Sequence, residues 1–200
     1  MSHRVGLDQA TVVEAAAKLV DEDGIEQLTL GRLAERLGVR TPSLYNHVAG
    51  LPGLKRDLAL YCLRDLLDRI LRTTIGKSGA EAIFALADAH RAYARETPGR
   101  YALTLQAPAP SDQELQAIAQ RIVDVLRAVL APYRLSEEEA IHAIRSLRSI
   151  VHGFSSLEVA GAFGMPVDLD ASFHWLINLF IAGLRRSAVT GEQKRSAMGK

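Results

Sequence analysis

The chain has 200 residues, of which 48% are hydrophobic, and a formal net charge of +1 at pH 7. This length suits one large domain or a small head with a larger body, and the near-neutral charge excludes blanket attraction to nucleic acid. Cys62 is the single cysteine, so an intramolecular disulfide is excluded and a reducing cytoplasm fits. The N-terminus lacks the apolar run of a signal peptide, and the longest apolar run, 175–184, is too short to span a bilayer.

The first predicted element is a helix that is capped by Asp8 and runs to about Asp23, where Gly24 ends it. We expect residues 1–6 to be frayed. One face of this helix is apolar and consists of Val12, Ala16, Leu19 and Val20.

Residues 28–48 predict two short helices joined by a tight turn. In the first, four apolar residues share one face at i, i+3, i+4 and i+7, namely Leu30, Leu33, Ala34 and Leu37. Thr29 can cap its free N–H groups, and Gly38 follows where a positive φ is usual. We expect the second helix to start with Thr41 as N-cap and Pro42 at its first position.

The second helix keeps Leu44 and Val48 inside and turns a polar set outward: Thr41, Ser43, Tyr45, Asn46 and His47. Short polar side chains near a helix start can reach base edges, and the hydroxyls and cations around them can hold phosphates. This pattern favours a DNA-binding helix-turn-helix, and the alternative is an exposed helical hairpin with an ordinary polar face. Local charge supports DNA, since residues 28–56 carry five cations and one anion, a net +4, whereas residues 1–27 carry two cations and six anions, a net −4.

The string LGV-x-x-P-S-L-Y-x-H-V within residues 37–48 resembles the DNA-binding domain of the tetracycline-repressor (TetR) family. The resemblance is close over about residues 7–60 and implies a three-helix head, a helical ligand-binding body and a homodimer. It implies base contacts from Arg40, Thr41 and Pro42, and phosphate or mixed contacts from Thr29, Ser43, Tyr45, Asn46 and His47. The family usually opens its fourth helix with lysine, where this chain has Leu51. Lys55 is assigned to the DNA-binding set in its place, and Arg56 is the other candidate.

The predicted fold is all-α, with about eight to nine helices: a three-helix head (1–50), a helical ligand-binding and dimerisation body (51–189) and a disordered tail (190–200). Within the body we expect helices over 51–75, 80–96, about 115–132, 136–161 and 170–186, with a loop or short helix over 100–110. Ser111 with Glu114, and Ser136 with Glu139, have capping-box spacing. The broad apolar stripe of the 51–75 helix predicts contacts with both head and body.

No metal, cofactor or catalytic site is expected, because the histidines lack metal-ligand spacing and neither a nucleotide loop nor a G-x-S-x-G elbow occurs. An enzyme is therefore the least favoured class. The 136–161 helix carries Arg145, Arg148, His152 and Ser156 at helical spacing, which indicates either a solvated face or a pocket wall or dimer contact. The run VHGFSSLEVAG also resembles a His-Gly motif of one TetR C-terminal domain class, without its preceding tryptophan.

Candidate ligand-binding residues are the aromatic and polar side chains of the body: His90, Tyr93, Tyr101, Arg148, His152 and Trp175. The last helix is apolar nearly all round, which predicts either a dimer interface or a central core helix. The residues assigned to the interface are Phe154, Leu157, Phe173, Leu176, Ile177, Phe180, Ile181 and Leu184.

The sequence thus predicts a cytoplasmic homodimeric regulator that binds near-palindromic operator DNA and is released by a small apolar or aromatic effector, without a membrane partner. The alternative is a DNA-binding structural or co-regulatory protein that senses no small molecule. A body cavity lined by a few polar groups would favour sensing, and a dry, filled core would favour the alternative.

Overall fold

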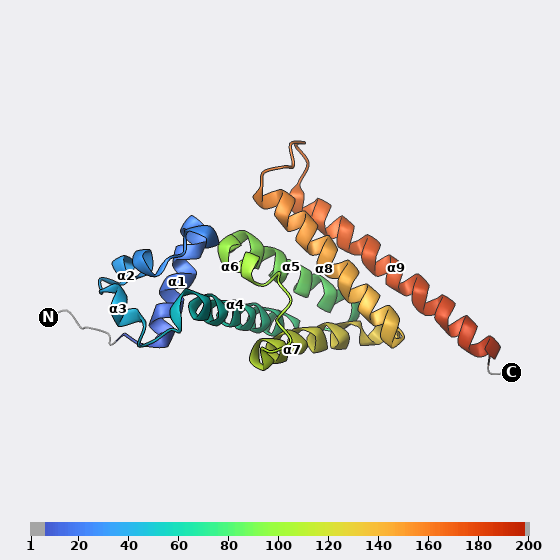
Figure 1. Cartoon of the computed structure of the whole chain (residues 1–200). Helices are drawn as coiled ribbons and strands as arrows, with labels where there is room; N and C mark the ends of the chain where they lie inside the picture. The colour runs from blue at the N-terminus through green and yellow to red at the C-terminus, as the bar shows by residue number, and fades with distance from the viewer. Residues whose placement is uncertain (1–6, 199–200) are drawn as a thin grey trace. The chain divides into compact units, whose positions relative to one another are not determined.

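The computed structural model describes residues 7–198, with side chains described for residues 7–186. Over this range the chain forms nine α-helices and two short 3-10 helices, and no strand (Figure 1). The predicted all-α fold is confirmed. Two compact units can be distinguished, which we call the head unit (Met1–Asp65 with Thr97–Ile118) and the body unit (Leu66–Glu96 with Ala119–Lys200). The frayed start predicted for residues 1–6 lies outside the described residues.

The head unit begins with α1 (Gln9–Asp23), the 3-10 helix η1 (Ile25–Gln27) and α2 (Leu30–Leu37). Each predicted end is made by the expected residue. The Asp8 carboxylate accepts the Thr11 N–H at 2.7 Å, and the Thr29 hydroxyl accepts the Arg32 N–H at 3.2 Å. Gly38 ends α2 in the left-handed region, with φ of 65°.

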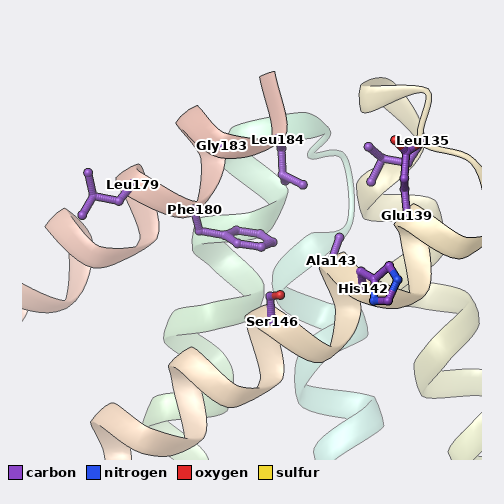
Figure 2. A pocket seen from close by; sticks show the side chains of 9 residues that line it. All are labelled: Leu135, Glu139, His142, Ala143, Ser146, Leu179, Phe180, Gly183 and Leu184. Atoms are coloured by element: carbon purple, nitrogen blue, oxygen red, sulfur yellow. The ribbon is translucent and has the colours of Figure 1, made fainter. Parts of the chain in front are cut away.

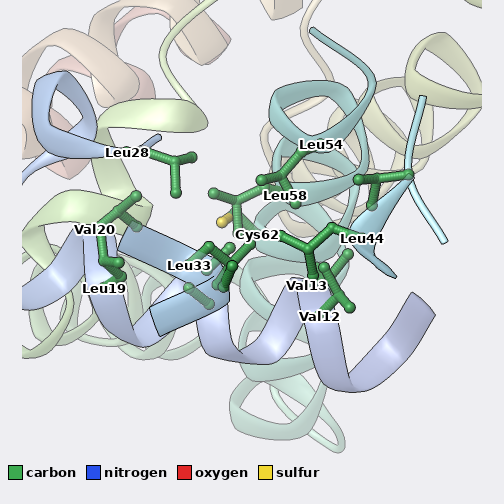
Figure 3. Close-up of a cluster of buried hydrophobic side chains, with 14 residues drawn as sticks. Val12, Val13, Leu19, Val20, Leu28, Leu33, Leu44, Leu54, Leu58 and Cys62 are labelled. Atoms are coloured by element: carbon green, nitrogen blue, oxygen red, sulfur yellow. The ribbon is translucent and has the colours of Figure 1, made fainter. Parts of the chain in front are cut away.

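A single apolar cluster holds these helices together (Figure 3). Leu33 from α2 and Leu44 from α3 are fully buried in it, together with Leu58 from α4 (Gly50–Thr74). Burying a leucine side chain contributes about 1.5–3 kcal/mol, so this cluster is sufficient to fix the orientation of the short α3. The polar residues of α3 are left outside it.

The second helix of the motif is shorter than its pattern suggested, because α3 spans only Thr41–Leu44 and a turn follows. The predicted N-cap is wrong by one residue. Arg40 occupies the cap position in an extended conformation and makes no side-chain capping bond, so Thr41 is already helical. Pro42 then lies within the first turn, where its missing N–H costs nothing.

The helix α6 (Pro98–Leu103) belongs to the head unit and packs on the end of α1. The approach is so close that a Cβ atom on Gly99 would collide with the carbonyl of Val20. Arg100 fixes the same joint. Its backbone N–H donates to Asp21 at 2.9 Å, its Nε donates to the same carboxylate at 2.6 Å, and its guanidinium reaches Asp65 at 3.1 Å. Glycine and arginine side by side therefore join α6 to α1.

The remaining helices are α5 (Gly79–Glu96), α7 (Gln113–Leu130), η2 (Ala131–Tyr133), α8 (Glu137–Val159) and α9 (Leu169–Met198). The capping box of Ser136 and Glu139 is confirmed at the start of α8. The box predicted from Ser111 and Glu114 is wrong. Asp112 caps α7 by accepting the Leu115 N–H at 3.2 Å, and Glu114 binds arginines instead. The tail 190–200, predicted to be disordered, lies outside the residues whose side chains are described.

The body core lies among α5, α8 and α9, with Leu147, Val151, Phe173 and Ile177 almost completely buried. Arg91 of α5 is the charged residue at its centre, with 6% of its side chain exposed. Two 2.7 Å hydrogen bonds join Arg91 to the Glu158 carboxylate, and the guanidinium lies about 5 Å from the rings of Phe154 and Phe173. Within the described residues, none of the helices is both long enough and apolar enough to cross a membrane.

Candidate functional site

The outward side of the helix-turn-helix has the exposure that nucleic-acid contacts require. Arg40, Pro42 and Asn46 are exposed, and Tyr45 is 61% exposed despite its size. Partial exposure is found for Thr41, Ser43 and His47, which lie at the edge of the same surface. Thr29 is exposed too, and its oxygen caps α2 while its hydroxyl hydrogen can still be donated.

Two of the arginines that made this region appear strongly cationic are already bound to acids of the head unit. Arg36 makes two hydrogen bonds of 2.6 and 2.7 Å to Glu22, and Arg32 donates to Asp23 at 2.7 Å. These pairs join α2 to the end of α1. Because the acidic residues 22 and 23 neutralise them, the local charge of +4 overstates what phosphates would meet.

Arg56 is bound in the same way. Its guanidinium donates to Asp112 at 2.6 and 2.9 Å and to Glu114 at 2.9 Å, which ties α4 to the start of α7 within the head unit. These carboxylates raise the pKa of Arg56 further, so it stays charged and occupied. Lys55 is exposed, and no ion pair to it is found among the described residues. Of the two candidates to replace the missing lysine at Leu51, Lys55 is the one with a cation to offer.

In the body unit, three of the candidate ligand-binding residues lie close together. His90 on α5 is partly buried, and Arg148 and His152 lie one turn apart on α8. Burial, together with smaller contributions from the neighbouring Arg148 and His152, lowers the pKa of His90 to about 4. His152 Nδ1 also lies 3.4 Å from the Ser156 hydroxyl. His90 is therefore a neutral imidazole next to two basic groups at pH 7.

The other three ligand candidates have different surroundings. Tyr93 is completely buried in the body unit, with the Arg69 guanidinium 5.0 Å from its ring. Tyr101 is buried in the head unit on α6. Trp175 is 65% exposed on α9, so it lines no enclosed part of the body.

The residues assigned to the dimer interface divide into two groups. Five of them are buried within the chain itself and belong to the body core, so they have little surface to offer a partner: Phe154, Phe173, Ile177, Ile181 and Leu184. Leu157 is about half exposed, and Leu176 and Phe180 are partly exposed. A helix that is apolar all round here serves the core first, which is the central-helix alternative.

Phe180 and Leu184 of α9 line a shallow groove of about 300 Å³ with residues of α8 (Figure 2). Figure 2 shows the Phe180 ring directed across the groove toward Ser146 and Ala143. The exposed leucine Leu179 lies on its rim.

Comparison with known proteins gives the family. Residues 12–47 match the family described as bacterial regulatory proteins, tetR family, and residues 83–180 match the tetracyclin repressor-like C-terminal domain. The uncharacterized HTH-type transcriptional regulator YobS of Bacillus subtilis is 36% identical over 185 residues, which cover 92% of this chain and 96% of YobS. The chain belongs to the TetR family of transcriptional regulators.

Other similar proteins agree with this assignment. The uncharacterized HTH-type regulator Rv0681 of Mycobacterium tuberculosis is 33% identical over 92% of this chain and 85% of its own length. A variant of TetR from Acinetobacter baumannii, solved in complex with minocycline, has the same fold, with a TM-score of 0.67, 24% identity and coverage of 92% of this chain and 99% of that chain. As a TetR-family regulator, the protein is a DNA-binding one.

Sequence reasoning missed several residues of this TetR-family chain that decide the site. The acids Glu22 and Asp23 at the end of α1 neutralise arginines spaced four apart on α2, and this complementary spacing was a usable signal. Gly99 had no comparable signal, because it acts through Val20, which is distant in sequence. No group of three or more potential metal ligands occurs within the described part of the chain.

Proposed function

We propose that the protein is an effector-responsive repressor that binds a near-palindromic operator as a homodimer and leaves it when a small apolar or aromatic molecule binds the body unit. One observation supports the DNA-binding part of this proposal. The polar side of α3 faces outward, and two cations beside it, Arg40 and Lys55, form no ion pair within the described residues. Three other arginines of the region are held by acids, so these two define where phosphates and bases are met.

The position of each residue relative to α3 indicates which part of the DNA its side chain can reach. Arg40 and Thr41 stand at the start of α3, where side chains reach base edges in the major groove. Tyr45 and His47 follow α3, and with Lys55 they are suited to holding phosphate oxygens. Ser43, Asn46, Pro42 and Thr29 complete the surface around them.

The DNA assignment is tested by selecting binding sites from a random duplex pool and then measuring variants on the selected site. Arg40→Ala should lower affinity for that site by about 1–3 kcal/mol and relax preference at one position. Lys55→Gln should lower the affinity for all duplexes by the same factor. It should also reduce the slope of log affinity against log salt concentration by about 1. Arg36→Gln is the matched control, because it removes the same charge from an arginine that Glu22 already neutralises. Selection of no common sequence would overturn the assignment.

We assign the dimer contact to the exposed sides of α8 and α9. Leu157, Trp175 and Leu179 are each about half exposed or more, and the groove lined by Phe180 adjoins Leu179. Large exposed apolar side chains on two neighbouring helices favour a symmetric contact with a second copy. A two-fold dimer would set the recognition segments about 34–36 Å apart, one DNA turn.

A double variant, Trp175→Glu with Leu179→Glu, tests this surface without touching the core. It should give a one-chain mass in light scattering and weak operator binding, while its helical content stays unchanged. Ile75→Glu is the control, since Ile75 is 75% exposed elsewhere in the body unit. A one-chain mass for the unmodified protein at micromolar concentration would contradict the dimer.

The effector response is supported by His90, Arg148 and His152, three polar side chains of the body unit that lie close enough to interact electrostatically. The solved TetR structure with minocycline is a protein of the same fold with a small molecule bound. Coupling must be reciprocal, so saturating operator DNA should weaken effector binding by the same factor, about 5–150-fold, by which effector weakens DNA binding. Equal effector affinity with and without operator would favour the alternative, a DNA-binding co-regulator without a sensor.

A further inference from the structure

The outer side of α9 is exposed and uncharged over a long stretch. Residues 171–183 include no Asp, Glu, Lys or Arg. The exposed residues of this stretch are Ala171, His174, Trp175, Asn178, Leu179, Ala182 and Gly183. Trp175 and Leu179 are the large apolar ones, with 65% and 50% of their surface exposed. Because a helix that faces water has charged and polar residues on its outer side, this side of α9 is suited to cover by another apolar surface.

Gly183 is the unusual residue of this outer side. It lies within α9 and is exposed, and a Cβ atom added to it would meet nothing within 4 Å. Glycine within a helix is destabilising relative to alanine. No close approach within the described part of the chain requires a glycine at this position. The space beside it is therefore available to a side chain from outside the chain.

Gly183 also lines the groove of about 300 Å³ between α8 and α9, which we call the Gly183 groove (Figure 2). The wall that α9 contributes consists of residues at i, i+1, i+4 and i+5, namely Leu179, Phe180, Gly183 and Leu184. Four residues of one helix form the kind of hole that receives a side chain from a second helix. Three of these four residues are apolar and large, and the fourth has no side chain. The hole is therefore apolar and open at Gly183.

The side chain that protrudes and the position that lacks one are equally spaced on the two sides of Leu179. Trp175, Leu179 and Gly183 are four residues apart, so they form one ridge along α9, with Trp175 and Gly183 each about 6 Å from Leu179 along the axis. Helices whose ridges of this spacing pack together cross at about 50°, the commonest class of helix packing in globular proteins. If two copies of α9 run in opposite directions about a two-fold axis beside Leu179, the partner's Trp175 meets the Gly183 groove, and the reverse contact forms at the same time.

The charges at the two ends of α9 favour opposite directions. Asp168, which caps the helix, and Arg186 are exposed and lie on the same side of α9 as Leu179, because the separations between them are close to whole helical turns. In an antiparallel contact, the partner's Asp168 lies nearer to Arg186 than to Asp168. A parallel contact would bring like charges together, which is unfavourable.

We propose that two copies of the chain pack α9 against α9 in opposite directions, with the partner's Trp175 inserted into the Gly183 groove and the two-fold axis beside Leu179. The inference rests on the proposed homodimer and specifies which residues meet across it. Each groove is completed by the indole of the other copy. Trp175 then belongs to the dimer contact and not to a ligand pocket.

Cysteine cross-linking of the full-length protein tests the direction of the two helices. A disulfide requires Cα atoms within about 7 Å of each other. Leu179→Cys places two thiols beside the two-fold axis, so mild oxidation should convert most of the protein to disulfide-linked dimers in non-reducing electrophoresis. Ala171→Cys is the matched control, because it is exposed on the same ridge and its two copies would lie about 24 Å apart along the helices. The parent, whose Cys62 is completely buried, gives the background.

The direction would be overturned if Ala171→Cys cross-linked as readily as Leu179→Cys, since that is the result expected for parallel helices. It would also be overturned if Leu179→Cys did not cross-link above the background of the parent.

Filling the groove tests the fit of the indole. Gly183→Leu should weaken dimerisation by about tenfold or more in analytical ultracentrifugation, because the leucine occupies the space of the partner's Trp175. The chain itself should lose no stability in chemical denaturation, since the new side chain replaces a helical glycine beside open space. Gly31→Leu, at an exposed helical position of the head unit, is the matched control and should dimerise like the parent.

A second substitution separates loss of fit from general damage. Trp175→Ala combined with Gly183→Leu should recover most of the lost dimer affinity, because the leucine can use the space that the indole leaves. Dimerisation of Gly183→Leu as strong as that of the parent would overturn the proposal, and so would a double variant weaker than both single variants.

The proposed homodimer and this contact fail differently. A one-chain mass for the parent in light scattering would remove both. A two-chain mass without cross-linking of Leu179→Cys would keep the homodimer and remove the contact between Trp175 and the Gly183 groove.

Discussion

Two arginine–carboxylate pairs, one in each unit, have almost the same geometry and opposite surroundings. In the head unit, Arg36 donates to both oxygens of Glu22 at 2.6 and 2.7 Å, and in the body unit Arg91 donates to both oxygens of Glu158 at 2.7 Å. The first pair stands in water, while the side chains of the second are only 6% and 10% exposed.

The lengths of these hydrogen bonds therefore say little about how much each pair contributes to the stability of the fold. Water competes for the exposed pair and screens it, so breaking it costs little. The buried pair is shielded from water, because Phe154 and Phe173 surround the Arg91 charge with apolar surface, and the other bond of Arg91 to a carboxylate is the one to Asp170 at 2.8 Å. The head unit can therefore lose this exposed pair at little cost, whereas the body unit relies on a buried clamp in which Arg91 of α5 binds Glu158 of α8 and Asp170 of α9.

The largest expected effect comes from breaking the buried clamp. Glu158→Gln removes the buried carboxylate of Arg91 and leaves it only the exposed Asp170 at 2.8 Å, so it should destabilise the protein by up to about 3–5 kcal/mol. Chemical denaturation followed by circular dichroism measures this. The paired replacement Arg91→Met with Glu158→Leu serves as control, because removing both charges together should recover most of the loss. A loss below about 1 kcal/mol in the single variant would mean that water reaches the clamp.

The second effect concerns another buried titratable group of the body unit, His90. Its folded pKa of about 4 lies below the ordinary 6.5, because burial and the charges of Arg148 and His152 oppose protonation. As pH falls, the unfolded chain takes up a proton near 6.5 while the folded chain does not. Stability from this group is thus intact above pH 6.5 and is lost as pH falls from 6.5 to 4, by about 3 kcal/mol in total.

Denaturation curves at a series of pH values for the parent and for His90→Gln measure this contribution. The stability difference between them should be constant above pH 6.5 and should shift in favour of the variant by about 3 kcal/mol toward pH 4. His142→Gln, which replaces an exposed histidine of α8, is the matched control. Parallel curves for His90→Gln and the parent down to pH 4 would contradict a buried neutral imidazole.

The third effect concerns the head unit, in which Gly99 occupies a position that does not tolerate a larger residue. Gly99→Ala places a methyl group against the Val20 carbonyl, so α6 must move away from α1 and strain the bonds of Arg100 to Asp21. We expect a loss of about 1–3 kcal/mol in chemical denaturation. Gly153→Ala is the control, because an added Cβ there meets nothing within 4 Å, and it should stabilise α8 by about 0.5–1 kcal/mol. Equal behaviour of the two variants would show that the α1–α6 joint yields without cost.

The sequence predicted those features that depend on neighbours along the chain. The caps Asp8, Thr29 and Ser136 and the left-handed Gly38 were all identifiable, because each acts on backbone groups within a few residues. The same local logic failed at Ser111. Its spacing to Glu114 was correct for a capping box, but α7 begins at Gln113, so Asp112 occupies the cap position, and Arg56 of α4 binds Glu114.

The candidate site was predictable in its residues and less so in its electrostatics. The polar face of α3 was evident from the spacing of Leu44 and Val48, whereas the commitment of Arg32, Arg36 and Arg56 to acids required the tertiary structure. The apolar α9 posed the opposite problem. Its pattern could not separate the core residue Phe173 from the exposed Leu179, since both faces of the helix are apolar.

The smallest expected effect is at the exposed pair, and it completes the comparison. Glu22→Gln removes one carboxylate from Arg36 and should leave the free energy of unfolding unchanged within the error of chemical denaturation, because both side chains stand in water. Its consequence should appear in DNA binding instead. The freed arginine lies on α2, the helix of the motif that crosses the DNA backbone, so affinity for any duplex should rise modestly at low salt. The gain should fade as salt is raised, since released counterions drive it. Arg36→Gln is the matched control, with unchanged stability and no gain. If Glu22→Gln instead destabilised the fold as Glu158→Gln does, exposure would not be what separates the two pairs, and the distinction between a tolerant head surface and a clamped body would have to be abandoned.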